Sequence, residues 1–389
     1  MISLFSRLFI KDRENYSDPT VRQAYGMLCS VCGIVLNVIL FAIKFFAGMI
    51  TGSIAVTADS FNNLGDAGSS VITLVGFRLS SQKPDPDHPF GHGRFEYISG
   101  LFVSIAILLM GFELVKSSFS KIIAPEPIES NTAAVIILVV SIIVKLYMSF
   151  YNRVVAKKIS SSSMKATATV SISDACSTFI VLCVTIITPY LSFSIDGYAG
   201  LLVALFILWM GINSVKETIS PLLGQSPEAE FVDKIEKTVM SYNEVTSIHD
   251  LVVHDYGPGR LMISLHAEIP STMDIMIAHD VIDNIENKLS AELGCHCVIH
   301  MDPIDVDDEF TNSLRISVAE LAAKIDDRIT IHDFRCVRGH THTNLIFDAV
   351  IPFECKIGDD MFKKRISESV KQIDPTYNCV IIIDKSYVK

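Results

Sequence analysis

Six long apolar runs fill the first 225 residues of the chain. A transmembrane helix needs roughly 20 apolar residues to cross a hydrocarbon core of about 30 Å, and each run is long enough. We therefore predict a six-helix membrane domain, with spans near Met27–Ile50, Ser53–Leu79, Phe95–Phe119, Thr132–Tyr151, Thr169–Leu191 and Ile195–Ile219. The segment before them, Met1–Ile10, lacks a small-residue cleavage site and is predicted to be an amphipathic surface helix.

After residue 225 the pattern changes to an α-β-β-α-β order that occurs twice. The first unit has predicted helices at Glu228–Tyr242 and Asp274–Leu293 and strands at Ser247–Asp255, Leu261–Ile269 and Cys297–Met301. Its segments SIHDLVVHD, LHAEIP and VIHMD resemble TIHDFRCVR, FDAVIP and VIIID in the residues that follow. We predict a tandem duplication of an α+β unit, each with three strands covered by two helices.

Composition and charge divide the chain in the same way. The chain is 50% hydrophobic and 19% charged, with a mean hydropathy of +0.41, which is too apolar for one soluble globule. Residues 1–225 hold 16 Lys and Arg against 14 Asp and Glu, whereas residues 226–389 hold 16 against 29. The strongly acidic soluble part disfavours nucleic-acid binding, which needs a basic surface. Nine scattered cysteines indicate a reducing compartment and no disulfide framework.

The distribution of Lys and Arg predicts the orientation. Basic residues precede the first span and occupy the connections after the second and fourth spans, while the connections after the first and fifth spans have none. By the positive-inside rule both termini are cytoplasmic, and the acidic part is then cytosolic.

Polar residues form a stripe on each of two spans. In the second span Asp59, Asn62 and Asp66 share one helix face, and in the fifth span Asp174 shares a face with two hydroxyl residues, Thr167 and Ser171. An unpaired carboxylate in mid-membrane costs about 2.5–3.5 kcal/mol or more, so these faces are predicted to meet around a divalent cation. The alternative is that the polar groups cap helices or bond between helices.

Two further groups of ionisable residues remain open to two interpretations. Asp85, His88 and His92 lie between the second and third spans at spacings that suit a zinc-like ion, although a solvated loop explains them equally well. Lys44 and Lys145 fall inside spans, where an ionisable group is a candidate functional residue, but we favour side chains that snorkel to the membrane surface because each lies near the end of its span.

The first cytosolic unit is rich in metal-ligand types, with six histidines and Asp302. In the second unit the positions that match His249, His266, His279, His300 and Asp302 hold His332, Asp348, Met361, Ile382 and Asp384. The ligand set is reduced there, which predicts a mainly structural or interface role. Cys295 and Cys297 are interpreted as a buried, idle pair.

Together these residues resemble the cation diffusion facilitator family of metal/proton antiporters. The resemblance covers Met27 to about Pro303 and rests on ADSFNNLGD, DHPFGHGRFEY, Asp174 and IHDL…SLHAEI…IAHDV…VIHMDP. It implies a homodimer in a lipid bilayer, a ferredoxin-like cytosolic domain and efflux of a divalent metal driven by protons. It also implies three sets of ligands: Asn62, Asp66 and Asp174 for transport; Asp85, His88 and His92 in the loop; and His249, His266, His279, His300 and Asp302 in the cytosol. Asp59, Thr167 and Ser171, which lie on the polar helix faces, are candidate auxiliary ligands of the transport site.

The chain departs from the family pattern at three positions. Asn62 and Val170 stand where the family generally has His or Asp, and Gly224 stands where an Asp is often found in a charged hinge. Without imidazole, the remaining oxygen donors favour Mn²⁺ or Fe²⁺ over Zn²⁺ without excluding zinc. Proton coupling would then rest on Asp66 and Asp174, which must both be ionised to bind metal.

The sequence thus predicts a divalent cation exporter in the plasma membrane, with no enzymatic activity and no organic cofactor. Its predicted parts are a cytoplasmic segment (1–26), a membrane domain (27–222), a cytosolic metal-binding and dimerisation domain (226–303) and a second ferredoxin-like repeat (311–389). Zn²⁺, Mn²⁺ or Fe²⁺ would be both substrate and regulatory cytosolic ligand. Two alternatives are a membrane-anchored metal sensor and a metal-dependent membrane enzyme, for which no catalytic motif occurs.

Overall fold

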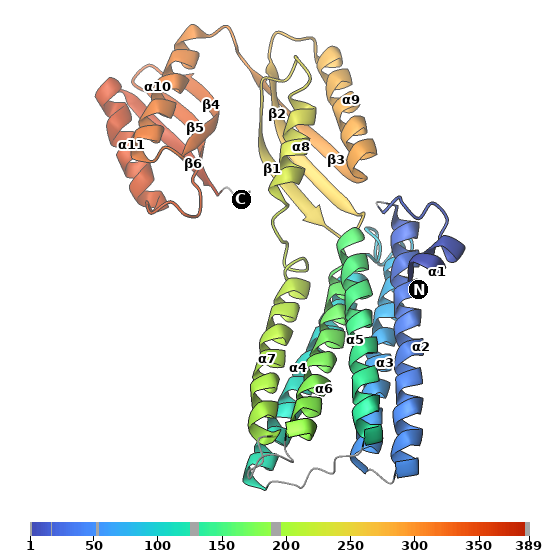
Figure 1. Ribbon diagram of the computed structural model, residues 1–389. Helices are drawn as coiled ribbons and strands as arrows, with labels where there is room; N and C mark the ends of the chain where they lie inside the picture. Colours follow the sequence, from blue (N-terminus) through green and yellow to red (C-terminus); the bar gives the residue numbers. More distant parts are fainter. Residues whose placement is uncertain (1, 17, 52–53, 125–131, 188–195, 386–389) are drawn as a thin grey trace. The chain divides into compact units, whose positions relative to one another are not determined.

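The computed structural model describes residues 2–16, 18–51, 54–124, 132–187 and 196–385 (Figure 1). They form two compact units. The first comprises Met1–Gln225 together with the short segment Asp255–Leu261, and the second comprises Ser226–His254 and Met262–Lys389.

Long helices make up the first unit. After the short α1 (Ile2–Phe9) come α2 (Pro19–Thr51), α3 (Ile54–Ser80), α4 (Phe95–Ile123), α5 (Thr132–Lys158), α6 (Ser162–Ile187) and α7 (Asp196–Ile219). Within the described residues, five of them are long and apolar enough to cross a membrane, namely α2, α4, α5, α6 and α7. Helix α3 is not among these five, and its sequence carries the polar stripe described above.

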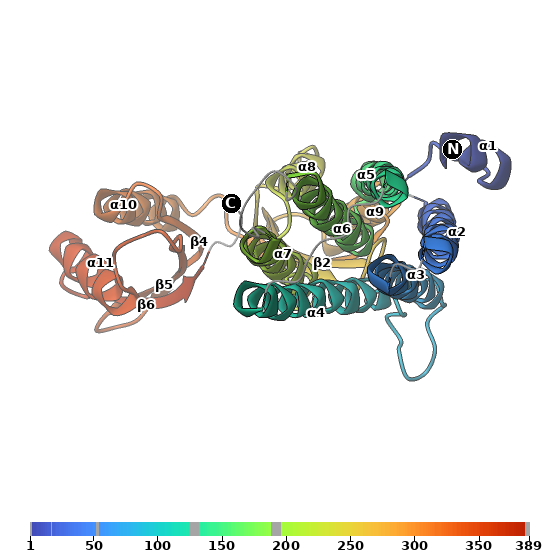
Figure 2. The same ribbon diagram turned by 60° about the horizontal axis from the view of Figure 1, so that its bottom comes forward.

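Helix α6 holds the bundle together. It packs against α3, α4, α5 and α7, and the end-on view shows it among the last three (Figure 2). Small residues allow other helices to approach closely: a Cβ added to Gly33 on α2 would lie only 2.8 Å from the Ser70 hydroxyl on α3. Such close contacts replace the hydrophobic driving force that helices lack inside a membrane.

The second unit contains two three-stranded sheets, each with two helices. The order is α8 (Ala229–Val239), β1 (Ser247–Asp255), β2 (Leu261–Pro270), α9 (Ile275–Leu293) and β3 (Cys295–Ile304), followed by α10 (Glu309–Ile325), β4 (Thr330–Arg338), β5 (Thr343–Val350), α11 (Asp359–Ile373) and β6 (Tyr377–Asp384). The strand orders are β1-β2-β3 and β4-β5-β6. Strand β5 pairs antiparallel with β4 and parallel with β6, and its alternate residues Leu345, Phe347 and Ala349 are fully buried in the core.

One backbone irregularity occurs at the same place in both sheets. Asp250 in β1 and Asp333 in β4 each follow a histidine and adopt left-handed backbone angles, with φ of 51° and 50°. Few residues other than glycine tolerate this conformation, and aspartate is one of them. In β4 the pairing register shifts between His332 and Arg335, as in a β-bulge that redirects a side chain.

Candidate metal sites

Two carboxylates and one ammonium group meet inside the helical bundle. Lys145 on α5 places its Nζ 2.5 Å from an oxygen of Asp66 on α3 and 2.8 Å from an oxygen of Asp174 on α6. The Lys145 side chain is 2% exposed and that of Asp66 is 6% exposed. The predicted meeting of the polar faces of α3 and α6 therefore occurs, with a lysine between them.

This position contradicts the interpretation of Lys145 as a snorkelling residue. The apolar run ends near Tyr151, but α5 continues to Lys158, so Lys145 lies midway along the helix. Lys44 is likewise buried and lines the same cavity, so it does not snorkel either. The hydrophobic pattern placed the end of α5 too early, because Asn152 and Arg153 continue as helix.

A cavity of about 280 Å³ surrounds the carboxylate pair. Most of its polar wall comes from α3 and α6. The polar or charged lining residues are Lys44, Asn62, Asn63, Asp66, Glu113, Ser117, Ser141, Lys145, Ser173, Asp174, Ser177 and Thr178. Of these, Asn63 has a buried amide nitrogen with no hydrogen-bond partner in the described structure, which makes it a donor available to water.

Two of the three predicted auxiliary residues, Thr167 and Ser171, do not line this cavity. Thr167 bonds to Thr73 across the helix interface at 2.9 Å, and the Ser171 hydroxyl donates to the Thr167 carbonyl oxygen in its own helix. The side chain of Asp59 lies outside the described residues. Val170 is buried in an apolar cluster with Val103 and Ile107, so it takes no part in the cavity wall.

Buried pairs of hydroxyl groups lie between the two carboxylates and the end of the bundle at which α2 begins. Besides Thr73 and Thr167, Ser99 on α4 and Ser163 on α6 approach to 3.1 Å. These pairs join α3 and α4 to α6, and they leave a polar but closely packed layer.

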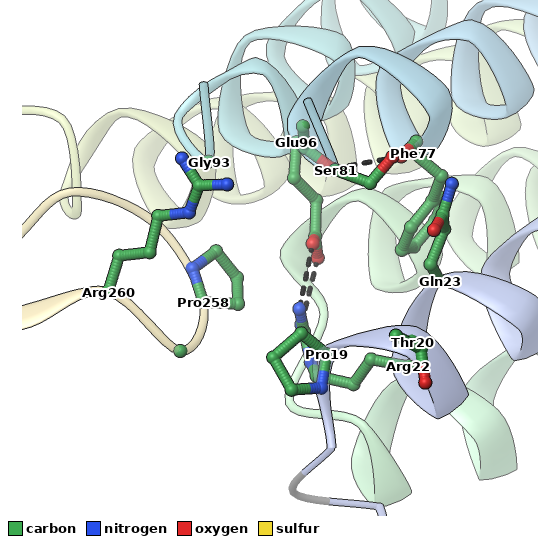
Figure 3. A pocket seen from close by; sticks show the side chains of 12 residues that line it. Pro19, Thr20, Arg22, Gln23, Phe77, Ser81, Gly93, Glu96, Pro258 and Arg260 are labelled. Atoms are coloured by element: carbon green, nitrogen blue, oxygen red, sulfur yellow. Dashed lines mark hydrogen bonds and ion pairs between the residues drawn. The ribbon is translucent and has the colours of Figure 1, made fainter. Parts of the chain in front are cut away.

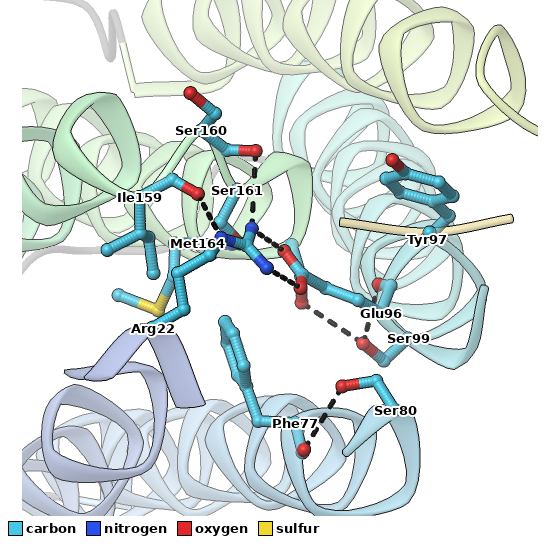
Figure 4. Close-up of polar contacts among 12 residues, drawn as sticks. Arg22, Phe77, Ser80, Glu96, Tyr97, Ser99, Ile159, Ser160, Ser161 and Met164 are labelled. Carbon is cyan, nitrogen blue, oxygen red and sulfur yellow. Dashed lines mark hydrogen bonds and ion pairs between the residues drawn. The ribbon is translucent and has the colours of Figure 1, made fainter. Parts of the chain in front are cut away.

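A buried ion pair lies at that same end of the bundle (Figure 4). Arg22 on α2 donates from both terminal nitrogens to the Glu96 carboxylate on α4, each at 3.1 Å, and from Nε to the Ile159 carbonyl oxygen at 2.6 Å. The Glu96 side chain is 1% exposed. One guanidinium group thus ties α2 and α4 to the turn between α5 and α6, and sequence patterns gave no sign of this link.

The segment Asp255–Leu261 also takes part in this end of the first unit. Arg260 donates to the Gln82 carbonyl oxygen at 2.7 Å, and the Tyr97 hydroxyl donates to the Asp255 carboxylate at 2.7 Å. Pro258 and Arg260 line a small pocket with Arg22 and Glu96 (Figure 3).

The loop residues Asp85, His88 and His92 converge as the spacing suggested. His88 Nδ1 and His92 Nε2 each lie 3.4 Å from a different oxygen of Asp85, and their ligand atoms all fall within 4.8 Å of one another. The Nδ1 atom of His92 is buried without a hydrogen-bond partner in the described structure. These three donors fit a zinc-like ion.

In the first cytosolic sheet, His249, His266 and Asp302 form a compact cluster. Asp302 Oδ2 lies 3.2 Å from His249 Nε2 and 2.8 Å from His266 Nδ1. The His249 side chain is 6% exposed, yet neither ring nitrogen makes a hydrogen bond within the described residues. A buried donor or acceptor without a partner is costly, and a metal ion would provide one.

The other predicted cytosolic ligands lie at the edge of this cluster. His300 Nε2 is 3.4 Å from Asp302, whereas His279 on α9 lines a surface cavity together with His300 and is not part of the cluster. Cys295 and Cys297 are both buried, and burial raises the pKa of the Cys297 thiol to about 12, which favours the protonated thiol in the metal-free protein.

The second sheet holds a cluster that the reduced ligand set did not lead us to expect. His332, Asp348 and Asp384 bring ligand atoms within 4.8 Å of one another, and His249, Asp250 and His332 do so as well. The sequence did contain a sign of this cluster, because His332 matches His249 and Asp384 matches Asp302. Matching positions of two repeats lie on equivalent strands, so residues that converge in one repeat are expected to converge in the other.

Comparison with known proteins identifies the chain. The family model for the cation efflux transmembrane domain matches residues 30–223, and the model for the cation efflux protein cytoplasmic domain matches residues 227–304. An uncharacterised transporter of Methanocaldococcus jannaschii is 33% identical over 276 residues, which cover 71% of this chain and 97% of the relative. The chain belongs to the cation diffusion facilitator family.

Other relatives of this cation diffusion facilitator carry a functional name. The cation-efflux pump FieF of Escherichia fergusonii is 27% identical over 290 residues, and that of Escherichia coli is 28% identical, in each case over 74% of this chain and 96% of the relative. The chain is therefore a membrane transporter of the cation efflux type. Residues 305–389, with the second sheet, lie beyond both family matches.

Proposed function

We propose that this protein exports a divalent metal cation from the cytoplasm in exchange for protons. The observation that carries the proposal is the buried pair of carboxylates, Asp66 and Asp174, which share one cavity and one cationic partner. Two carboxylates in a low-dielectric site demand positive charge, and the cation-efflux names of the relatives support a metal ion as the exported species.

The proposed orientation has both termini in the cytoplasm and α3 as a sixth span. The lining residues Lys44, Glu113 and Thr178 lie on the half of their helices that faces away from the cytoplasm in this orientation. The hydroxyl layer and the Arg22–Glu96 ion pair lie on the cytoplasmic side. This arrangement supports alternating access, with the pathway closed toward the cytoplasm.

Lys145 competes with the metal ion for the carboxylates of Asp66 and Asp174. Its ammonium group occupies the space between Asp66 and Asp174 that a bound cation would take, so the metal displaces it. The remaining donors are carboxylate, amide and hydroxyl oxygens, and Val170 adds none. This set favours Mn²⁺ or Fe²⁺, with Zn²⁺ as the weaker competitor.

The two sheets have separate roles in the proposed function. Residues 226–303 form a ferredoxin-like domain that binds regulatory metal through His249, His266 and Asp302 and dimerises in a homodimer at the plasma membrane. Residues 311–389 are a second copy of that fold, since their elements follow the same α-β-β-α-β order.

Metal flux into proteoliposomes tests the function. Wild-type protein is expected to transport Mn²⁺, Fe²⁺ or Zn²⁺, and the double variant Asp66→Asn with Asp174→Asn is expected to lose at least 100-fold in rate. Glu217→Gln is the matched control, because this carboxylate is exposed and pairs with Lys165. Undiminished flux in the double variant contradicts the proposal, and metal binding without any flux would favour the sensor.

A further inference from the structure

The second cytosolic sheet presents one histidine and two carboxylates from three adjacent strands. His332 on β4 is directly opposite Asp348 on β5, and Asp384 is the last residue of β6, which pairs with β5. His332 Nε2 lies 3.4 Å from Asp384 Oδ2. The convergence therefore follows from strand register and does not depend on a flexible loop.

The backbone that positions His332 is the same as in the first sheet. Asp333 repeats the left-handed conformation of Asp250, directly after the histidine. A left-handed aspartate costs free energy and persists only where the surrounding structure requires it. The second sheet has therefore kept the local geometry that turns this histidine toward its neighbours, although the sequence around it has changed.

Within the part of the chain that the structure describes, no lysine or arginine forms an ion pair with Asp348 or Asp384. Among the described residues, Asp384 forms an ion pair with His332 only, and the adjacent Lys385 bonds instead to Asp359 on α11. Both ring nitrogens of His332 are buried and lack hydrogen-bond partners in the described structure. The cluster thus combines unneutralised negative charge with unused nitrogen ligands.

The cluster also reaches residues of the first sheet. The rings of His249 and His332 stack with centroids 4.5 Å apart, and His332 Nε2 lies 3.9 Å from Asp250. The His249 side chain, at 6% exposed, is more than nine-tenths buried, and its nitrogens have no hydrogen-bond partner within the described residues. The cluster around Asp302 and the cluster around Asp384 are therefore neighbours, joined by the contact between His249 and His332.

We propose that His332, Asp348 and Asp384 bind a second divalent transition-metal ion. One imidazole and two carboxylates suit Mn²⁺, Fe²⁺ or Zn²⁺, with water or Asp250 completing the coordination. Because His332 contacts His249, a metal ion at this site would link the second sheet to the cluster of His249, His266 and Asp302 in the first sheet. This site belongs to the part of the chain beyond the family matches and is separate from the transport cavity.

Metal stoichiometry of the full-length protein in detergent tests the proposal. After equilibrium dialysis against Zn²⁺ or Mn²⁺, the double variant Asp348→Asn with Asp384→Asn is expected to retain about one equivalent of metal per chain less than wild type. Asp359→Asn is the matched control, because this carboxylate pairs with Lys385 outside the cluster. An unchanged stoichiometry in the double variant overturns the site.

Two further readouts separate metal binding from misfolding. In chelator, the double variant is expected to be at least as heat-stable as wild type, since it lacks the like-charge contact, while its gain in stability on adding metal is smaller. Asp348→His introduces the residue type that the first sheet has at the matching position, His266. This variant is expected to keep the full metal stoichiometry of wild type and to bind Zn²⁺ at least tenfold more tightly than wild type does. Lower stability in chelator, or loss of the equivalent in Asp348→His, indicates a structural cluster and overturns the proposal.

Neither result depends on transport. Flux through the membrane domain at saturating metal is expected to be measurable in the double variant, whereas failure of the transport proposal would abolish flux in wild type and leave the stoichiometry difference intact.

Discussion

The carboxylates in the helical bundle and those in the two sheets are neutralised in different ways. Asp66 and Asp174 share the ammonium group of Lys145, which is part of the chain. Among the described residues, Asp302 and Asp384 form ion pairs only with histidines, whose ring nitrogens carry a charge only when protonated. One region contains a permanent cation, and the other has sites that a cation from solution would complete.

The difference follows from the surroundings of each region. A carboxylate in the membrane is costly when no cation neutralises it, so the ammonium group of Lys145 stabilises Asp66 and Asp174 in the absence of metal. A cytosolic carboxylate is partly solvated and tolerates an empty site at lower cost. The clusters in the two sheets therefore tolerate the absence of a cation better than the carboxylate pair in the helical bundle does.

Removing the internal cation is the strongest test of this contrast. Lys145→Met leaves Asp66 and Asp174 buried without a partner, and breaking a buried ion pair by deleting one member costs about 3–5 kcal/mol. We expect the metal-free variant to unfold at a markedly lower temperature and Mn²⁺ to restore most of the loss, because the metal no longer competes with Lys145. Thermal unfolding with and without Mn²⁺ measures both effects.

Lys157→Met is the control for this variant, since Lys157 is exposed on the same helix. Its stability and its response to Mn²⁺ are expected to match those of wild type. If Lys145→Met behaves in the same way, the lysine is not the counter-ion of the transport site.

The second test compares a buried and an exposed ion pair within the membrane domain. Arg22→Met leaves Glu96 buried without its partner and is expected to lower the free energy of unfolding by about 3 kcal/mol. Lys165→Met breaks the exposed pair with Glu217, which is worth about 0–1 kcal/mol. Denaturant unfolding in detergent compares the two variants, and equal effects would show that Arg22 does not hold the helix ends together.

The smallest expected effect concerns an exposed cytosolic carboxylate that already has its own donors. Asp308 accepts hydrogen bonds from the Thr311 hydroxyl and from the backbone N–H groups of Thr311 and Phe310, so its pKa lies below the ordinary value. Its stabilisation of α10 is complete above the unfolded pKa of about 3.9 and is lost as pH falls through the lower folded pKa.

Asp308→Asn keeps a good helix cap but removes this titration. Hydrogen-exchange protection of the first turn of α10 is expected to fall as the pH is lowered below about 4 in wild type and to stay level in the variant. A fall of the same size in both proteins would show that other carboxylates govern the acid response of this helix.

Much of the fold follows from the sequence pattern alone. The apolar runs predicted helices that the structure contains, and strand β1 has the predicted limits Ser247–Asp255. Period and length suffice here because a helix or strand is set by residues that are near one another in the chain. The convergence of Asp66 with Asp174 was also predictable, since two polar faces inside a membrane have few alternatives to meeting each other.

Tertiary structure decided which groups complete each site. Lys145 and Arg22 gave no periodic signal, because their partners lie on other helices and a single ionisable residue has no pattern of its own. Val170 was known from the sequence to lack a ligand atom, but only packing showed that it is buried in an apolar cluster and does not line the cavity. In the second sheet the sequence indicated a reduced ligand set, whereas strand register brought His332, Asp348 and Asp384 together. The sequence determines local structure and charge, while ion pairs and ligand clusters depend on distances between residues far apart in the chain.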